Sequence, residues 1–427
     1  MNDRHPSDPY IGALLGLACG DALGAPVEFM DRDAIAEQHG QLTEMVGGGQ
    51  FGWAPGEWTD DTGMALCVAE GILDQPADPV PEVGRRFIEW RQDAKDVGKT
   101  IAAAIANAET HNEGGRQGWL KRHGSSTVDW SEASRTTPQA RNHKAAGNGS
   151  LMRTLPIALG YLSVRRMLDA SARISAMTHW DPQAEVCCAA YCLWVQEVAL
   201  GIDPRTAWQT ALNQAREVAD EGRRSDDSPG PAPLPEGFWS RLQAAPEREI
   251  DELQPTGYAG YVVDCLEAAV WAAVNSDSLE EALVTLVNLG GETDTMAAVA
   301  GGAVGARFGQ QAIPQRWLSS LHQRQRLEKA ARDLFDLRDR LVYSKPTLPE
   351  LGLRQIEDSL FCGRTPLTAK DVERLLHAGV TQVLDLREDH EWEKPGRFGR
   401  EAIAALDWCG VQRDSIPIVD GNAPSPE

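Results

Sequence analysis

Two short segments place carboxylate and hydroxyl side chains together where a helix is expected to begin. The segments are GEWTDDTGMAL and NLGGETDTMAAV, and their candidate ligands are Thr59, Asp60, Asp61, Glu292, Asp294 and Thr295. Hard cations such as Mg²⁺ and Mn²⁺ prefer carboxylate, hydroxyl and water oxygens. Four carboxylates brought together would repel one another unless cations neutralised them. If the fold joins the two segments, they predict a site for two divalent cations bridged by a shared carboxylate.

The same residue types also have an ordinary structural role. Asp, Thr and Ser at the start of a helix commonly cap it, and either segment alone fits a cap better than a ligand set. Two acidic helix starts in one domain are harder to explain in this way. Spacing alone therefore leaves both interpretations open.

The helices that must position these segments have a recognisable pattern. Glycines at 12, 16, 20 and 24, and again at 301, 305 and 309, recur every four residues in apolar sequence. This spacing puts them near one helix face, where a neighbouring helix can approach closely. Apolar residues elsewhere follow a helical period, and few runs before residue 345 alternate as strands do. We expect an all-α domain over residues 1–345, interrupted by loops at 110–146 and 221–247.

Composition limits the partners of the chain. A formal net charge of −22 over 427 residues disfavours anionic membranes and non-specific nucleic-acid binding. The eight cysteines include no CxxC pair, which favours reduced thiols in a cytoplasmic protein. The apolar run over 11–26 is expected to be too short to cross a membrane and contains Asp21. In such a helix Asp21 is expected to hydrogen-bond a neighbouring helix rather than catalyse.

After residue 345 the pattern changes. SKPTLPELG is typical of a linker, TAKDVERLLHAG of a helix capped by Thr368, and VTQVLDL of a buried strand. We expect a small α/β module over 346–427.

Six motifs in order resemble those of the ADP-ribosylglycohydrolase family. They are GLACGDALGAPVEF, GEWTDDT, GNGSLMR, THWDPQAE, GYVVDCLEAAVWA and NLGGETDTMAAVAGGAVGARFG, and they run from about residue 9 to residue 320. The resemblance implies a compact orthogonal helical fold and a hydrolase that releases ADP-ribose from a modified acceptor. It also implies two Mg²⁺ or Mn²⁺ ions at the acidic helix starts, with Asp61 and Asp294 acting in catalysis.

The resemblance assigns further residues by position. Glu28 matches a glutamate that covers the metals, and it would position the attacking water or the ribose. Asn148, Gly149 and Ser150 match the diphosphate and ribose region, His179 a histidine near the phosphates, and Tyr261 an aromatic near the adenine. Without the resemblance, His179 fits a capping or core histidine, Tyr261 a core tyrosine and the Gly-Asn-Gly run any turn. Arg153 fits a structural ion-pair partner equally well.

Two departures from the family pattern matter. The family usually reads GGDTDT, whereas this chain has Glu292 at the first acidic position, which puts metal affinity or preference in doubt. Some members that act on arginine carry an aspartate with a base role just before the GNG loop. Here residues 141–146 contain no carboxylate. The acceptor-side chemistry is therefore expected to differ or to use another residue.

The tail resembles the opening half of a dual-specificity or tyrosine-phosphatase domain, with Asp420 at the general-acid position. Such enzymes need a Cys with an Arg six positions later, and no cysteine here has one. We expect no phosphatase activity from it, and either a truncated domain or a remnant that docks a protein partner.

Three functions follow as alternatives. The first is a dinuclear-metal-dependent hydrolase acting on ADP-ribosylated protein, nucleobase or small molecule. The second is a non-catalytic ADP-ribose-binding member of the same fold. The third is a scaffold that uses the tail.

Overall fold

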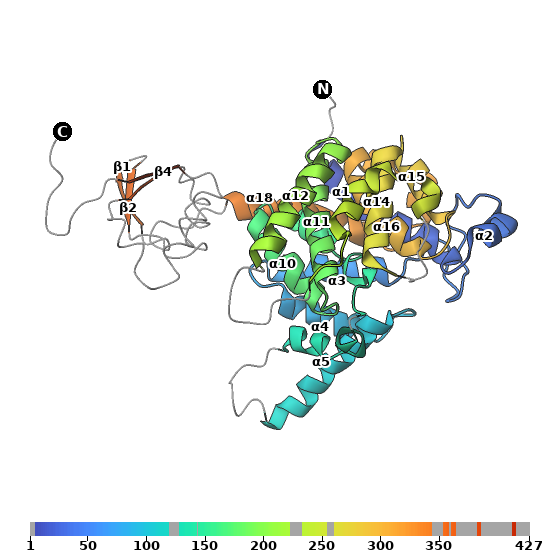
Figure 1. Ribbon diagram of the computed structural model, residues 1–427, viewed down its shortest axis with the longest axis horizontal. Coiled ribbons are helices and arrows are strands. Elements are labelled where there is room, and N and C mark those ends of the chain that lie inside the picture. Colours follow the sequence, from blue (N-terminus) through green and yellow to red (C-terminus); the bar gives the residue numbers. More distant parts are fainter. Residues whose placement is uncertain are drawn as a thin grey trace. The chain divides into compact units, whose positions relative to one another are not determined.

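The structure is a computed structural model that describes residues 5–118, 128–142, 144–222, 233–253 and 260–343, together with four short strands in the tail. The chain divides into two units, Met1–Arg338 and Asp339–Glu427, slightly upstream of the boundary expected after residue 345. The described part of the first unit consists of helices joined by loops and turns (Figure 1), as the all-α prediction required.

The helices of the first half of the chain are, in order, α1 (Asp8–Gly24), η1 (Ala25–Val27), α2 (Arg32–His39), α3 (Asp60–Asp74), α4 (Val80–Trp90), α5 (Lys99–Gly118), α7 (Trp130–Arg135), α8 (Pro138–Arg141), η2 (Asn148–Ser150), α9 (Leu155–Gly160), α10 (Val164–Ala176), α11 (Pro182–Ala199) and α12 (Pro204–Gly222). They are followed by α13 (Phe238–Ala244), η3 (Ala245–Glu247), η4 (Ile250–Leu253), α14 (Val262–Asn275), α15 (Leu279–Val287), α16 (Thr293–Phe308), η5 (Gln310–Ala312), α17 (Gln315–Ser320) and α18 (Arg324–Tyr343).

Helices α1 and α16 pack backbone against backbone through their glycines. A Cβ added to Gly16 would lie 2.2 Å from the carbonyl oxygen of Gly301, and one added to Gly305 would lie 2.1 Å from that of Gly12. Only glycine allows this approach, so the predicted close packing of two glycine-faced helices is confirmed. Gly309 lies just beyond the last residue of α16 with φ +80°, and it still contacts α1, because a Cβ added to Gly12 would lie 2.6 Å from the Gly309 carbonyl carbon.

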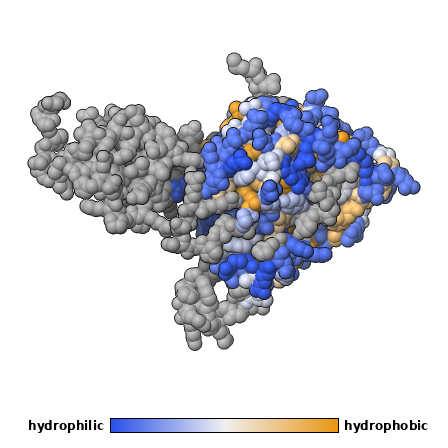
Figure 2. Space-filling model, in the orientation of Figure 1, coloured by the Kyte–Doolittle hydropathy of each residue, from blue (hydrophilic) through white to orange (hydrophobic). Residues whose placement is uncertain are grey.

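Helix α1 is the centre of the core. Residues Asp8–Val27 are long and apolar enough to cross a membrane, so the expectation that this run is too short was wrong. Apart from Pro9, that stretch is buried within the protein, where it contacts α16, α3 and α9. The face seen in Figure 2 is largely hydrophilic outside the grey residues, with small hydrophobic patches.

Both expected loop regions contain helices. Residues 110–146 include the end of α5 and helices α7 and α8, and residues 221–247 include α13 and η3. The short helices in these polar segments were not predicted. Two of them begin at N-caps, where the side chains of Asp129 and Thr137 accept hydrogen bonds from the backbone amides of Glu132 and Ala140, respectively.

In the second unit the structure describes β1 (Leu353–Glu357) paired antiparallel with β2 (Leu360–Gly363), and β3 (Gln382–Asp385) paired parallel with β4 (Gln412–Ser415). The strand expected in VTQVLDL is present as β3. The helix expected from Thr368 and the general-acid position Asp420 lie outside the described residues.

Candidate active site

Helix α1 holds both acidic helix starts in place. The carboxylate of Asp21 accepts hydrogen bonds from the backbone amides of Thr59 and Thr62, each at 2.9 Å, and from the Thr62 hydroxyl at 2.5 Å. One turn later in α1, the Gly24 carbonyl accepts a hydrogen bond from the Thr293 hydroxyl at 3.0 Å. Asp21 therefore bonds a neighbouring helix, as predicted.

The first acidic start is the N-terminus of α3. Thr59 is the N-cap, and its hydroxyl accepts a hydrogen bond from the Asp61 amide at 3.3 Å. Asp61 is fully buried, and its Oδ2 forms no hydrogen bond with any described residue. A buried carboxylate oxygen without a partner is costly, and a cation or a proton bound there would lower that cost. Thr59 thus serves as a cap and still lies beside the candidate ligands.

The second acidic start, at α16, meets the first. The Thr295 hydroxyl lies 3.4 Å from Asp61 Oδ1, and the Thr295 amide donates to Asp294 Oδ1 at 2.8 Å. Glu292 occupies the N-cap position, but its side chain makes no capping hydrogen bond. The carboxylate is therefore not used as a cap. The fold brings together the six candidate ligands that the sequence places far apart.

The carboxyl groups of this cluster raise one another's pKa. Burial, Asp294 and Asp21 raise the pKa of Asp61 well above its usual value, and burial with Asp21 and Glu292 does the same for Asp294. Burial and Asp96 raise the pKa of Asp60 to about 8. Burial also raises the pKa of Glu292, with a contribution from Asp96. Such mutual repulsion marks a site that positive charge would stabilise.

Glu28 lies at the same cluster. Its loop is fastened to the second acidic start by two backbone hydrogen bonds of 2.8 Å, from Phe29 to Gly291 and from Gly291 to Met30. Burial, Asp294 and Asp96 raise the pKa of Glu28 to about 10, and its Oε2 is buried without a hydrogen bond among the described residues. The structure therefore places Glu28 beside the second acidic helix start.

Asp96 is a member of the cluster that sequence reasoning missed. It lies in the loop between α4 and α5, and burial raises its pKa. Its charge in turn raises the pKa of Glu28, Asp60 and Glu292. No motif surrounds it, so only its proximity to the other carboxyls reveals it.

The donor set suits hard divalent cations. All six candidate ligands offer oxygen, and unpartnered buried oxygens remain on Asp61 and Glu28. Among the described residues, no three His, Cys, Asp or Glu side chains are arranged so that they could hold a metal ion together. The fit therefore rests on ligand type and on the unpaired oxygens.

A second group of predicted residues forms around the Gly-Asn-Gly loop. The loop pairs with the start of α14: the Asn148 amide donates to the Gly260 carbonyl at 2.7 Å, and the Val262 amide to the Ala146 carbonyl at 3.1 Å. A Cβ on Gly260 would lie 3.3 Å from Asn148 Oδ1 and 3.7 Å from Glu292 Oε2. The loop therefore lies beside the acidic cluster.

The other predicted ligand contacts surround this loop. His179 is buried against it: a Cβ on Gly147 or Gly149 would come within 3.1 or 2.9 Å of the imidazole ring. The two glycines therefore make room for His179, a role not foreseen from the sequence. The Ser150 hydroxyl is buried and accepts a hydrogen bond from Cys188 Sγ. Tyr261 is only half-buried and bonds Gln183, so it is not a core tyrosine.

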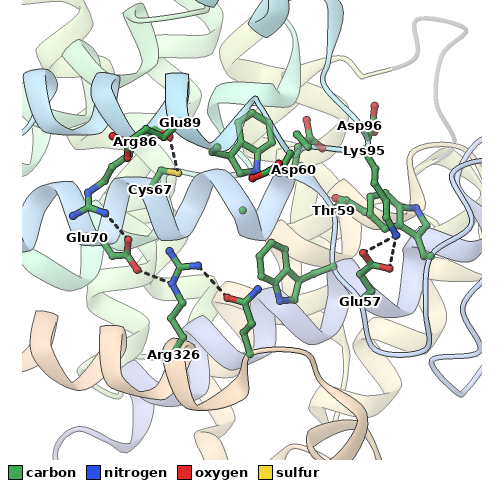
Figure 3. Close-up of a pocket in the computed structure, with 17 residues that line it drawn as sticks. Glu57, Thr59, Asp60, Cys67, Glu70, Arg86, Glu89, Lys95, Asp96 and Arg326 are labelled. Carbon is green, nitrogen blue, oxygen red and sulfur yellow. Dashed lines mark hydrogen bonds and ion pairs between the residues drawn. The ribbon is translucent and has the colours of Figure 1, made fainter.

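A pocket of about 460 Å³ lies along the outer face of α3 (Figure 3). It borders Thr59, Asp60 and Asp96 of the cluster, and its walls carry three indoles: Trp53, Trp58 and Trp90. Gly63 lies between two of them, since a Cβ there would meet Trp90 at 2.6 Å and Trp58 at 3.3 Å.

The cations of this pocket already have partners. Lys95 pairs with Glu57 at 2.7 Å, and Arg86 and Arg326 each pair with Glu70 at 2.7 Å. The acidic lining residues Asp60, Asp93 and Asp96 form no ion pair with any described residue. The pocket therefore offers carboxyl groups without ion pairs beside aromatic rings.

Comparison with known proteins identifies the family of the chain. The ADP-ribosylglycohydrolase family profile matches residues 2–341. ADP-ribosylarginine hydrolase Tri1 of Pseudomonas putida (strain GB-1) is 32% identical over 344 residues, covering 78% of this chain and 81% of its own. ADP-ribosyl-(dinitrogen reductase) glycohydrolase of Rhodospirillum rubrum is 30% identical over 322 residues, covering 74% and 90%.

A solved structure described as an ADP-ribosylglycohydrolase-related protein complex is also similar. It has a TM-score of 0.56 and 31% identity, and the match covers 78% of this chain and 99% of that one. The profile, the two relatives and the solved structure all indicate the same family. The helical fold predicted from the six motifs is confirmed. The chain belongs to the ADP-ribosylglycohydrolase family.

Proposed function

We propose that this protein hydrolyses the glycosidic bond between C1″ of ADP-ribose and a modified acceptor, with two divalent cations. The observation that carries the proposal is the meeting of the two acidic helix starts, where Thr295 lies 3.4 Å from Asp61 and a buried oxygen of Asp61 has no partner among the described residues. The names of the relatives, hydrolases of ADP-ribosylated arginine and dinitrogen reductase, support the reaction class.

The cations would be held by the oxygen ligands Thr59, Asp60, Asp61, Glu292, Asp294 and Thr295. When bound, Mg²⁺ or Mn²⁺ would supply the positive charge that orients the ribose hydroxyls and water and offsets the repulsion between the carboxyls. Asp61 and Asp294 are central to the cluster and would face the positive charge that develops on the ribose as its bond to the acceptor breaks.

Two further carboxyls are available to move protons. Hydrolysis takes one proton from the attacking water and gives one to the leaving acceptor, while a C–O bond replaces the broken glycosidic bond. Glu28 and Asp96 lie at the edge of the cluster, and the charge of Asp96 raises the pKa of Glu28. We assign Glu28 to positioning the water or the ribose and Asp96 to the acceptor side, where it lines the pocket.

The remaining parts of ADP-ribose would lie along the Gly-Asn-Gly loop. The backbone amides of Gly149 and Ser150 and the side-chain amide of Asn148, whose Nδ2 has no hydrogen-bond partner among the described residues, would bind phosphate oxygens with His179 beside them, and Tyr261 would contact the adenine end.

The pocket along α3 favours a cationic acceptor such as an arginine side chain. A guanidinium can stack on an indole face and pair with a carboxylate. Trp58 and Trp90 offer such faces, whereas Lys95 already lies over the Trp53 ring, 5.0 Å from its centroid. Asp93 and Asp96 offer carboxylates without ion pairs in the described structure. This assignment agrees with the arginine-directed name of one relative.

The deciding experiment measures ADP-ribose release from arginine-, serine- and nucleobase-linked substrates, with Mg²⁺ or Mn²⁺ and with a chelator. We expect release from the arginine-linked substrate that the chelator abolishes and added cation restores. Release from no substrate would refute the enzymatic proposal. Metal-dependent binding of ADP-ribose without turnover would favour a non-catalytic ADP-ribose-binding protein.

A further inference from the structure

Behind the Gly-Asn-Gly loop lies a buried arginine without a carboxylate partner. Arg153 is completely buried, and the described residues place no acidic side chain in ion-pair contact with it. Its Nη1 donates to the Gly149 carbonyl at 2.8 Å, and its Nη2 donates to the Ile174 carbonyl at 3.0 Å. The guanidinium also lies over the ring of Phe87, 4.9 Å from the centroid. The structure therefore retains a buried positive charge that it does not neutralise, which is unusual without a function.

The hydroxyl of Thr178 links this arginine to His179. Arg153 Nη2 donates to Thr178 Oγ1 at 2.7 Å, and Thr178 Oγ1 lies 2.8 Å from His179 Nδ1. An arginine can only donate, so the threonine oxygen accepts from it. Nδ1 is the other hydrogen-bond partner that the described structure gives this hydroxyl. Because Thr178 is fully buried, its proton would be left without an acceptor unless Nδ1 takes it.

This arrangement determines the tautomer of the imidazole. A ring nitrogen that accepts a hydrogen bond carries a lone pair, so the proton of a neutral ring is on the other nitrogen, Nε2. Burial and the charge of Arg153 lower the pKa of His179 to about 3, so the ring is neutral. Nε2 lies against the loop, 3.1 Å from a Cβ on Gly147 and 3.2 Å from one on Gly149.

We propose that Arg153 and Thr178 are positioning residues that hold His179 as the Nε2–H tautomer, so that the ring donates a hydrogen bond to an anionic oxygen bound at the Gly147–Ser150 loop. This inference rests on the proposed function, in which the anion is the diphosphate of ADP-ribose. Arg153 does not reach the ligand. It holds the Gly149 carbonyl away from the anion and adds positive potential behind the loop.

The test reads the tautomer and the affinity separately, in the full chain. Long-range ¹H–¹⁵N NMR assigns the protonated nitrogen of His179, and calorimetry measures ADP-ribose binding. Thr178→Val keeps the shape but removes the hydroxyl, whereas Thr178→Ser keeps the hydroxyl. We expect Nε2–H in the wild type and in Thr178→Ser. In Thr178→Val we expect a loss of that tautomer and ADP-ribose affinity weaker by about tenfold or more.

A second variant guards against misfolding of the first. Arg153→Lys keeps the charge but not the paired hydrogen bonds, and we expect intermediate affinity with partial loss of the Nε2–H tautomer. An Nδ1–H tautomer in the wild type would overturn the inference, as would unchanged affinity in a folded Thr178→Val. A wild type that binds no ADP-ribose would instead refute the proposed function, while the NMR result would still report the tautomer.

Discussion

The carboxylate of Asp21 accepts a hydrogen bond from the backbone amide of Thr59 at 2.9 Å, which fastens the start of α3 to the central helix α1. Asp21 accepts two further hydrogen bonds from Thr62, and it is fully buried. One side chain thus positions the first half of the acidic cluster without belonging to the candidate ligand set.

Asp21→Asn should therefore destabilise the protein. In this variant an amide nitrogen replaces one carboxylate oxygen. The nitrogen cannot accept the hydrogen bonds that this oxygen now receives, and the loss costs about 1–3 kcal/mol. Urea unfolding with and without Mg²⁺ measures the change. Asp33→Asn, at an exposed position in the first turn of α2, is the control and should be neutral. Equal stability of the two variants would show that Asp21 does not anchor α3.

The two halves of the acidic cluster should tolerate different changes. Glu292→Asp should retain turnover, since an oxygen ligand remains and the family pattern has aspartate there. Asp294→Ala should abolish turnover by removing a buried carboxylate beside Asp61. Steady-state rates over a range of Mg²⁺ and Mn²⁺ concentrations report both effects. An active Asp294→Ala enzyme would contradict the proposed cation site.

Without cations, stability should fall as pH rises. Asp60 and Glu28 have folded-state pKa values of about 8 and about 10, above the ordinary 3.8 and 4.5. The folded protein therefore binds these protons more tightly than the unfolded chain. Their stabilising effect is complete below about pH 4 and is lost as pH rises through the folded values. Melting temperatures in chelator at pH 5, 7 and 9 should show the decline.

Added Mg²⁺ should reverse this decline, with a larger gain at pH 9 than at pH 5. Asp60→Asn should flatten the pH dependence in chelator, because it removes one of the titrating groups. If the stability of the wild type depended on pH as weakly as that of the variant, the pKa of Asp60 would not be raised in the folded protein.

Trp90 should contribute to acceptor binding rather than to ADP-ribose binding. Loss of an indole face next to a guanidinium costs a modest cation–π interaction, so Trp90→Ala should raise KM for an arginine-linked substrate by about three- to tenfold. Trp90→Phe should recover part of the loss. Calorimetry with free ADP-ribose should give the wild-type affinity for both variants. An equal loss for both ligands would place Trp90 outside the acceptor site.

The contact between α1 and α16 should not accept a methyl group. A Cβ at Gly16 would lie 2.2 Å from a backbone oxygen, so Gly16→Ala should destabilise the fold by about 1–3 kcal/mol or more. Gly98→Ala is a suitable control, since its Cβ would meet only Ile101 at 3.6 Å. Thermal unfolding compares the two, and a neutral Gly16→Ala would show that the two helices can separate without cost.

The sequence alone determined the features that depend on local pattern. The four-residue glycine spacing in α1 and α16 is visible because a helix repeats every 3.6 residues, and the acidic helix starts are visible because caps and ligands use few residue types. These patterns predicted the helical fold. They also predicted that Thr59–Asp61 and Glu292–Thr295 form one cation site. Short polar helices such as α7 were missed because their period is too brief to detect.

The tertiary structure decided the relationships between residues that no local pattern connects. Asp61 and Thr295 lie 234 positions apart, and Asp96 joins them from a loop without a motif. Arg153 and Thr178 act on His179 through hydrogen bonds whose geometry exists only when α10 packs behind the loop. Hydrogen bonds and repulsion between carboxyls act only over short distances. Residues far apart in the sequence come that close only in the folded protein.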